Sequence, residues 1–150
     1  MAGGAARPEV ARRGAGADLE RLILDTTILI AAERIGLRLD DLIGDEDDVA
    51  IAAVTAAELL VGVELADASR RKGRHSFVEG LLESVPVEEY DLEVARVHAT
   101  LLAHTRRTGR VRGAHDLLIA ATAVSRHRIV VTADATGFGD LPGVEVRTAA

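Results

Sequence analysis

Four carboxylates next to apolar segments are the residues of this chain best placed for chemistry: Asp25, Glu58, Asp116 and Asp134. Ionised carboxylates that converge at the edge of a core repel one another, and an unpaired buried charge is costly. No lysine stands near them in the sequence to offset their charge. A divalent cation would do so, and Mg²⁺ or Mn²⁺ prefers oxygen ligands of this kind. The four acids therefore predict a hard-metal site.

These acids stand where expected strands end or expected helices begin. Asp25 directly follows the apolar run 22–24, and Thr132 and Asp134 follow the run 129–131. The other two acids lie within one turn of the start of a helical segment. In open α/β sheets, ligands bind outside the carboxyl ends of the strands. We therefore expect these polar residues to meet at one edge of a sheet.

Each acid also has a purely structural interpretation. Asp25 and Asp116 fit the N-cap of a helix, where Asp is a preferred residue. Glu58 stands three residues after Thr55, a spacing that fits a capping box. Asp134 fits an ordinary turn, because glycines follow it closely. Taken singly, the structural role is favoured for all but Asp25, and it is the set of four that favours a metal site.

The absence of cysteine and the places of the histidines narrow the chemistry further. Without cysteine there is no disulfide, thiolate metal site or cysteine nucleophile, so any metal ligand is oxygen or histidine. His98 and His104 are six residues apart and do not share a helix face. His115 precedes Asp116 and is a candidate for substrate contact, although surface or core placement is the favoured interpretation of every histidine.

Short apolar runs alternate with segments of helical spacing. The expected strands are residues 21–25, 49–54, 85–87, 129–132 and 144–146. The expected helices are residues 26–34, 56–66, 77–82, 92–105 and 116–125, and residues 45–48 form an acidic loop. Pro86 favours an edge strand, because proline cannot donate to a central ladder. The alternation predicts an α/β fold with a mainly parallel sheet flanked by helices.

The length of 150 residues is that of one domain, which we assign to residues 21–150. Residues 1–20 form a leader rich in Gly, Ala and Arg. We interpret it as disordered or as the result of a start codon placed too early, with a basic arm for nucleic acid as the alternative. No apolar stretch approaches the roughly 20 residues that span a bilayer, and the leader lacks the apolar centre of a secretory signal. We therefore expect a cytoplasmic protein without a membrane partner.

The net charge of −6 is unusual for a protein that binds nucleic acid, since phosphate binding favours a basic surface. Positive charge is instead gathered locally, in Arg70, Arg71, Lys72 and Arg74, in Arg106, Arg107, Arg110 and Arg112, and in Arg126 and Arg128. Arginine favours bidentate phosphate contacts. A GC-rich genome would give the same bias without a function, and that compositional explanation is favoured.

Four segments of the chain, residues 22–30, 54–62, 116–123 and 132–138, resemble in order the four motifs of PIN-domain ribonucleases. The chain length fits best with their VapC branch, the toxins of bacterial toxin–antitoxin pairs. The resemblance implies a flavodoxin-like sheet, usually in a homodimer, and cleavage of single-stranded or looped RNA. It also implies a small VapB-like antitoxin partner that masks the site, by inserting an arginine among the carboxylates.

The resemblance carries over the acidic residues of the family to the four acids named above, and a hydroxyl near the metal or its waters to Thr132. Many relatives have a further acid just before the phenylalanine of the last motif. Here Gly137 stands in that place, before Phe138. This departure weakens the expectation of a second tightly held metal, but not of the first.

The expected reaction is hydrolysis of an RNA phosphodiester by a water activated by Mg²⁺ or Mn²⁺. Asp25 and Asp116 are expected to bind the metal directly, and Glu58 and Asp134 to bind it directly or through waters. The arginine clusters would position the RNA backbone without specifying sequence.

Three other functions remain possible interpretations of the same acids. A receiver-like magnesium-binding signalling domain would need a lysine after a late strand, whereas the single lysine is Lys72. A phosphatase of the Asp-x-Asp type is disfavoured because Thr27 stands two residues after Asp25. A catalytically silent PIN-fold module that binds RNA or protein is disfavoured because all four acids are present.

Overall fold

The computed structural model describes residues 19–36, 41, 44 and 47–149. Of the leader expected at residues 1–20, only the last two residues lie in the described part. Residues 45 and 46 of the expected acidic loop also lie outside it.

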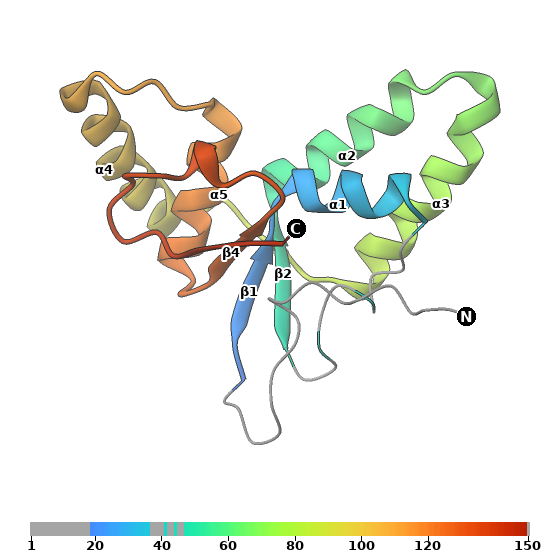
Figure 1. Cartoon of the computed structure of the whole chain (residues 1–150), viewed down its shortest axis with the longest axis horizontal. Helices are drawn as coiled ribbons and strands as arrows, with labels where there is room; N and C mark the ends of the chain where they lie inside the picture. The colour runs from blue at the N-terminus through green and yellow to red at the C-terminus, as the bar shows by residue number, and fades with distance from the viewer. Residues whose placement is uncertain (1–18, 37–40, 42–43, 45–46, 150) are drawn as a thin grey trace.

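A five-stranded parallel sheet forms the centre of the described chain (Figure 1). Its strands are β1 (Arg21–Leu24), β2 (Asp48–Ala52), β3 (Val87–Glu88), β4 (Ile129–Thr132) and β5 (Val146–Thr148). The strand order is β3-β2-β1-β4-β5, and each neighbouring pair is parallel. This confirms the expected fold class. It also places β1 in the middle of the sheet, with the ends of β2 and β4 on either side of its own.

Helices cover both faces of the sheet (Figure 1). They are α1 (Thr26–Arg34), α2 (Ala53–Leu65), α3 (Ala68–Ser84), α4 (Leu92–Thr108) and α5 (Ala114–Ser125). Side chains alternate between the two faces of a strand. Leu22 and Leu24 of β1 accordingly pack in the core that includes α1, α2 and α3, and Ile23 packs in the core that includes α4 and α5. None of the described helices is long and apolar enough to cross a membrane.

Local capping sets several helix ends. The side chain of Asp91 accepts a hydrogen bond from Val94 N and starts α4, which ends at Gly109 with a left-handed φ of 69°. The side chain of Asp67 accepts from Arg70 N and starts α3. The expectation of a helix over only residues 77–82 is therefore wrong, because the Asp67 cap begins it at Ala68 and the basic run is helical.

Several further boundaries differ from the expected ones, and three of the differences, at β2, β3 and β5, concern the strands. β2 ends at Ala52, where the chain turns directly into α2, so the helix begins earlier than expected. β3 is Val87–Glu88, because it pairs only with the last two residues of β2. β5 is Val146–Thr148, because its register with β4 runs to the last residue of that strand. All three differences concern where a short apolar run stops.

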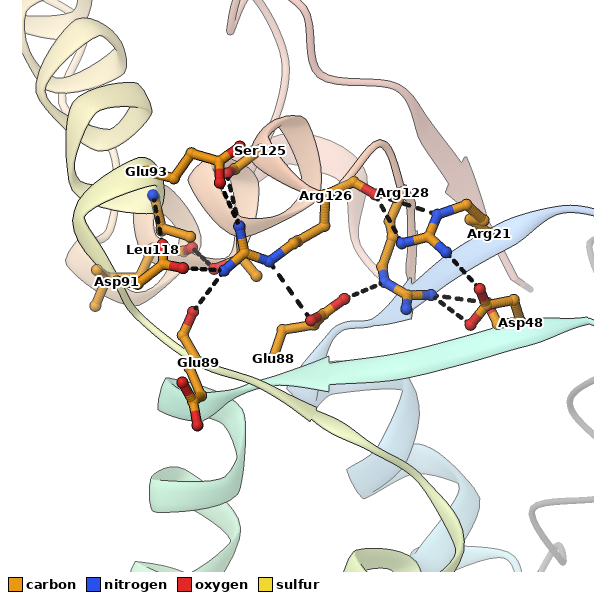
Figure 2. A network of polar contacts seen from close by, with 12 residues as sticks. Arg21, Asp48, Glu88, Glu89, Asp91, Glu93, Leu118, Ser125, Arg126 and Arg128 are labelled. Carbon is orange, nitrogen blue, oxygen red and sulfur yellow. Dashed lines mark hydrogen bonds and ion pairs between the residues drawn. The ribbon is translucent and has the colours of Figure 1, made fainter.

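A buried arginine connects the strands β1, β2 and β3 (Figure 2). Arg128, which directly precedes β4, is 8% exposed. Its Nη1 donates to Leu22 O at 3.1 Å, to Asp48 O at 2.9 Å and to Asp48 Oδ1 at 3.0 Å. Its Nε donates to Glu88 Oε2 at 2.7 Å. The guanidinium thus satisfies groups of β1, β2 and β3 together.

Arg126 extends this network toward α4 (Figure 2). Its guanidinium forms ion pairs with Asp91 at 2.6 Å and with Glu88 at 3.5 Å. Its backbone carbonyl accepts from the Arg21 side chain at 3.0 Å. These ion pairs with carboxylates of the fold reduce the charge that Arg126 and Arg128 offer to RNA, and a role for them in holding RNA stays a prediction.

Arg128→Ala is expected to lower the free energy of unfolding by about 3–5 kcal/mol, because removing one partner of a buried ion pair leaves the other charge uncompensated. Chemical denaturation followed by circular dichroism measures this loss. The matched control is Arg96→Ala, since Arg96 is exposed on α4 and should change stability by no more than about 0.5 kcal/mol. Equal effects of the two substitutions would contradict a structural role for Arg128.

Candidate active site

The carboxyl ends of β1 and β4 meet around Asp25. This residue directly follows β1, and its backbone N–H donates to Val131 O of β4 at 2.8 Å. Glu58 comes from α2, which starts directly after the neighbouring strand β2. Burial raises the pKa of Asp116, and the charges of Asp25, Glu58 and Asp134 raise it further. The four sequence-predicted acids therefore share one electrostatic environment.

Asp25 is buried, with 2% of its surface exposed, and its carboxylate is fixed from three directions. Oδ1 accepts from Thr26 N at 2.8 Å. Oδ2 accepts from Thr27 Oγ1 at 2.8 Å and from Thr132 Oγ1 at 2.7 Å. Asp25 is also the N-cap of α1, so the capping interpretation is confirmed. The cap and the site use the same carboxylate.

A pair of threonine hydroxyls holds Asp25 in place. Thr27 Oγ1 and Thr132 Oγ1 are 3.0 Å apart. Each accepts a backbone N–H at 3.1 Å, from Ala133 and Asp134 respectively. A hydroxyl that accepts from the backbone keeps its single proton for another acceptor, here Asp25 Oδ2. The structure thus places Thr132 beside Asp25, and it adds Thr27, whose place two residues after Asp25 served in the sequence only as evidence against a phosphatase.

Glu58 is held by two groups from other elements. Its Oε1 accepts from Thr26 Oγ1 at 3.0 Å, and its Oε2 lies 3.0 Å from His115 Nδ1. His115 is exposed, as expected for the histidines, yet its ring contacts a site residue. Thr26 was not predicted from the sequence as a site residue, although its place directly after Asp25 was a signal for it.

The capping-box interpretation of Glu58 is wrong. The N-cap of α2 is Ala52, which makes no side-chain cap, and Thr55 lies inside the helix. Thr55 is fully buried, and its Oγ1 has no hydrogen-bond partner within the described chain. Glu58 therefore does not serve the helix start, and its carboxylate is free to serve the site.

Asp116 carries the least compensated charge of the site. It is half-buried in the first turn of α5, whose N-cap is Gly113, so the N-cap interpretation of Asp116 is wrong. Within the described residues no hydrogen-bond donor contacts its carboxylate. Burial and the charges of Asp25, Glu58 and Asp134 raise its pKa, while His115 lowers it. Its place at a helix N-terminus is electrostatically favourable for a negative charge.

Asp134 is exposed, and a turn occupies part of its carboxylate. Oδ1 accepts from Thr136 Oγ1 at 2.7 Å and from Thr136 N at 3.0 Å. These hydrogen bonds lower the pKa of Asp134, and the one from the Thr136 side chain has the larger effect. They cap the short 3₁₀ helix η3 (Ala135–Gly137), which confirms the turn interpretation. A metal-binding role for Asp134 stays a prediction.

The atoms of this site that could bind a metal fit a hard divalent cation. They are carboxylate and hydroxyl oxygens, the ligands that Mg²⁺ and Mn²⁺ prefer. Within the described residues no hydrogen-bond donor contacts the Asp116 carboxylate, and the negative charges of three other acids act on it. Among the residues that the structure describes, no three acidic or histidine side chains are grouped tightly enough to hold one ion. The kinds of atom at the site therefore fit a cation, while the carboxylates are farther apart than they would be around one bound ion.

The remaining basic clusters are partly occupied by ion pairs. Arg110 and Arg112 both pair with Asp140, the latter at 3.5 Å. Arg74 of α3 pairs with Glu33 of α1 at 3.4 Å. These arginines belong to the local clusters of positive charge in the sequence, and the ion pairs reduce the charge that each offers to a phosphate.

The chain matches the model of the PIN domain over residues 22–143. It is 39% identical over 115 residues to Ribonuclease VapC5 of Mycobacterium tuberculosis, a match that covers 75% of this chain and 82% of that protein. It is 30% identical over 128 residues to Ribonuclease VapC of Rickettsia bellii, covering 85% of this chain and 95% of that protein.

A solved structure agrees with these matches. The structure of VapBC-5 from Mycobacterium tuberculosis, a member of the VapBC family of toxin–antitoxin systems, is similar to this chain with a TM-score of 0.71 and 32% identity. The similarity covers 86% of this chain and 98% of that one. The chain thus belongs to the PIN-domain family, in the group of the VapC ribonucleases, which confirms the resemblance.

Thr132→Val is expected to destabilise the protein by about 1–3 kcal/mol, because it removes a buried hydroxyl that serves Asp25 Oδ2 and Asp134 N. The matched control is Thr55→Val, which removes a buried hydroxyl without a partner and should be neutral or stabilising. Thermal and urea denaturation of the two variants measure the difference. A similar loss in both would mean that the hydroxyl of Thr132 does not anchor Asp25.

Asp116→Asn is expected to stabilise the metal-free protein at neutral pH by up to about 1 kcal/mol, the usual size of interactions between partly exposed charges. The raised pKa means that the folded state binds the proton of Asp116 more tightly than the unfolded state does. The charge of Asp116 therefore destabilises the folded state fully above its raised folded-state pKa. This destabilisation disappears as the pH falls toward the ordinary pKa of an aspartate in the unfolded chain. Urea midpoints across pH 3–8 test this, and a gain that persisted at the acid end would contradict it.

Proposed function

We propose that this chain is a metal-dependent endoribonuclease that acts as the toxin of a toxin–antitoxin pair. The observation that carries the proposal is the buried Asp25, fixed by two threonine hydroxyls beside Glu58 and Asp116 in a PIN-domain chain. The matching relatives are named ribonucleases, which supports RNA as the substrate class.

The carboxylates would hold a divalent cation, Mg²⁺ or Mn²⁺, with Asp25 and Asp116 as first ligands and Glu58 and Asp134 binding directly or through waters. When bound, such a cation supplies activation of a water nucleophile and offsets charge on the phosphate oxygens. No serine, cysteine or histidine nucleophile is required by this chemistry.

The other residues of the chain orient these groups. Thr27 and Thr132 each present a hydroxyl to Asp25 Oδ2, so the carboxylate cannot rotate without losing hydrogen bonds. Thr26 holds Oε1 of Glu58, and His115 lies against Oε2. His115 is also the exposed group nearest in sequence to Asp116, and we propose that it contacts the RNA backbone at the scissile position.

A receiver-like signalling role does not fit the described residues. Lys72 is exposed on α3 and does not follow a strand of the sheet. A catalytically silent PIN-fold module would not require a buried carboxylate held by three hydrogen bonds beside uncompensated acids. The hydrolase therefore accounts for more of the geometry than either alternative.

An antitoxin of the VapB type is the proposed protein partner. It is supported by the similarity to VapBC-5, a structure from a toxin–antitoxin family. A homodimer, which the family resemblance implies, is proposed as the functional form. Both proposals concern assembly, and the cleavage experiment that follows does not depend on either.

Purified protein is expected to cut a mixed RNA pool with Mg²⁺ or Mn²⁺ and to stop cutting in EDTA. Glu58→Gln should slow cleavage roughly 10–100-fold, the usual loss when a group that holds or supports a metal is changed. Asp25→Asn should abolish it. The products are resolved on denaturing gels.

The matched control is Glu83→Gln, which makes the same chemical change at an exposed position of α3 and should leave the rate unchanged. Cutting that survives EDTA, or that survives Asp25→Asn in a preparation free of other nucleases, would contradict the proposal. Binding of RNA without cutting, with metal bound, would support the silent module instead.

A further inference from the structure

The carboxylate of Asp116 lies between two glycines. A Cβ built on Gly137 would be 2.3 Å from Asp116 Oδ2 and 2.9 Å from its Cγ. A Cβ built on Gly113 would be 3.3 Å from the same Oδ2. The first contact is closer than real Cβ atoms come to an oxygen. The Asp116 carboxylate therefore occupies the volume that a side chain at position 137 would fill.

Neither glycine is there for its backbone conformation. Gly113 has a φ of −60°, and Gly137 is not among the described glycines with positive φ. A glycine loses more conformational entropy on folding than other residues do. At an ordinary negative φ this cost is not offset by a backbone conformation that only glycine adopts readily. The close approach of Asp116 explains the glycine at position 137 instead, because the missing Cβ leaves room for the Asp116 carboxylate.

The backbone on both sides of this contact is fixed by burial. Phe138, directly after Gly137, is 2% exposed, and Leu117, directly after Asp116, is 4% exposed. Both pack in the core cluster between the sheet and the helices α4 and α5. Because neither backbone can move away cheaply, a side chain at position 137 would be accommodated by rotating the Asp116 carboxylate out of its place.

We propose that Gly137 is a positioning residue for Asp116, and that its missing side chain forms the slot in which this carboxylate is held toward the site. Gly113 closes the slot on the side of the α5 N-terminus. It follows that an acid introduced at position 137 would displace Asp116 as it entered, so the site does not gain a ligand by that change alone. The part of this proposal that concerns metal rests on the proposed function.

The test compares Gly137→Ala with Gly139→Ala. A Cβ at Gly139 would meet nothing within 4 Å, and its carbonyl, which accepts from Arg112, is retained in alanine. Mn²⁺ alone is the probe, and its dissociation constant is measured by calorimetry or by its paramagnetic resonance signal. Gly137→Ala should weaken Mn²⁺ binding about tenfold or more, as changes that misplace a ligand usually do. Gly139→Ala should leave it unchanged.

A double-mutant cycle separates positioning from general damage. In an Asp116→Asn background the ligand has already been lost, so adding Gly137→Ala should not weaken Mn²⁺ binding further. The same loss in both backgrounds would overturn the proposal. If Gly137→Ala does not fold alone, the Asp116→Ala/Gly137→Ala chain should fold, because the carboxylate that clashes is gone. Its failure to fold would also overturn the proposal.

A crystal structure of metal-free Gly137→Ala gives a readout that does not depend on activity. The Asp116 carboxylate is expected in a different rotamer, with the positions of Phe138 and Leu117 unchanged. An unmoved carboxylate would overturn the proposal. Wild-type protein that binds no Mn²⁺ and cuts no RNA, together with a rotated Asp116 in the variant, would refute the proposed function and support the positioning role.

Discussion

Repulsion among carboxylates is the constraint on which the carboxyl edge of this sheet depends. Asp25, Glu58 and Asp116 come from three elements, and the charges of the first two raise the pKa of the third beyond the effect of its burial. The fold offsets this with neutral donors. Hydroxyls of Thr27 and Thr132 bind Asp25. A hydroxyl satisfies the hydrogen-bonding capacity of a carboxylate but leaves its charge in place, so the edge keeps a negative charge that an added cation can neutralise.

Around Arg128, two other carboxylates are instead paired with a cation (Figure 2). There, Asp48 and Glu88 are paired directly with the buried Arg128. In the described chain, no arginine forms an ion pair with Asp25 or Asp116. The acids of this network are thus neutralised by arginine, whereas Asp25 and Asp116 are not. Asp48, the first residue of β2, lies at the opposite end of the parallel strands from Asp25, which follows the last residue of β1.

The sequence was sufficient to predict those features that depend on neighbours along the chain. The apolar run before Asp25 and the spacing of the helix after it predicted β1 and α1 correctly, and the strand before Thr132 as well. The end of β2 was misplaced because alanines around position 53 fit a strand and a helix equally well. The meeting of the acids at one edge of the sheet followed from the expected topology, whereas individual contacts between the side chains of distant residues could not be foreseen. Arg128 reaches Asp48 across 80 positions, and no local pattern distinguishes it from an arginine that binds phosphate.

Gly137 is a second example of a contact between distant residues that the sequence does not show. In the sequence it stands where the family resemblance implied a further acidic ligand. In the structure it is a space, filled by a carboxylate from α5 that lies 21 positions earlier in the chain. A site made of groups that repel one another must restrict where each can turn, and it does so with hydrogen bonds for Asp25 and with backbone contact for Asp116. The η3 turn alone could not provide that contact. The burial of Phe138 holds the turn close enough to α5 for the absence of one Cβ to matter.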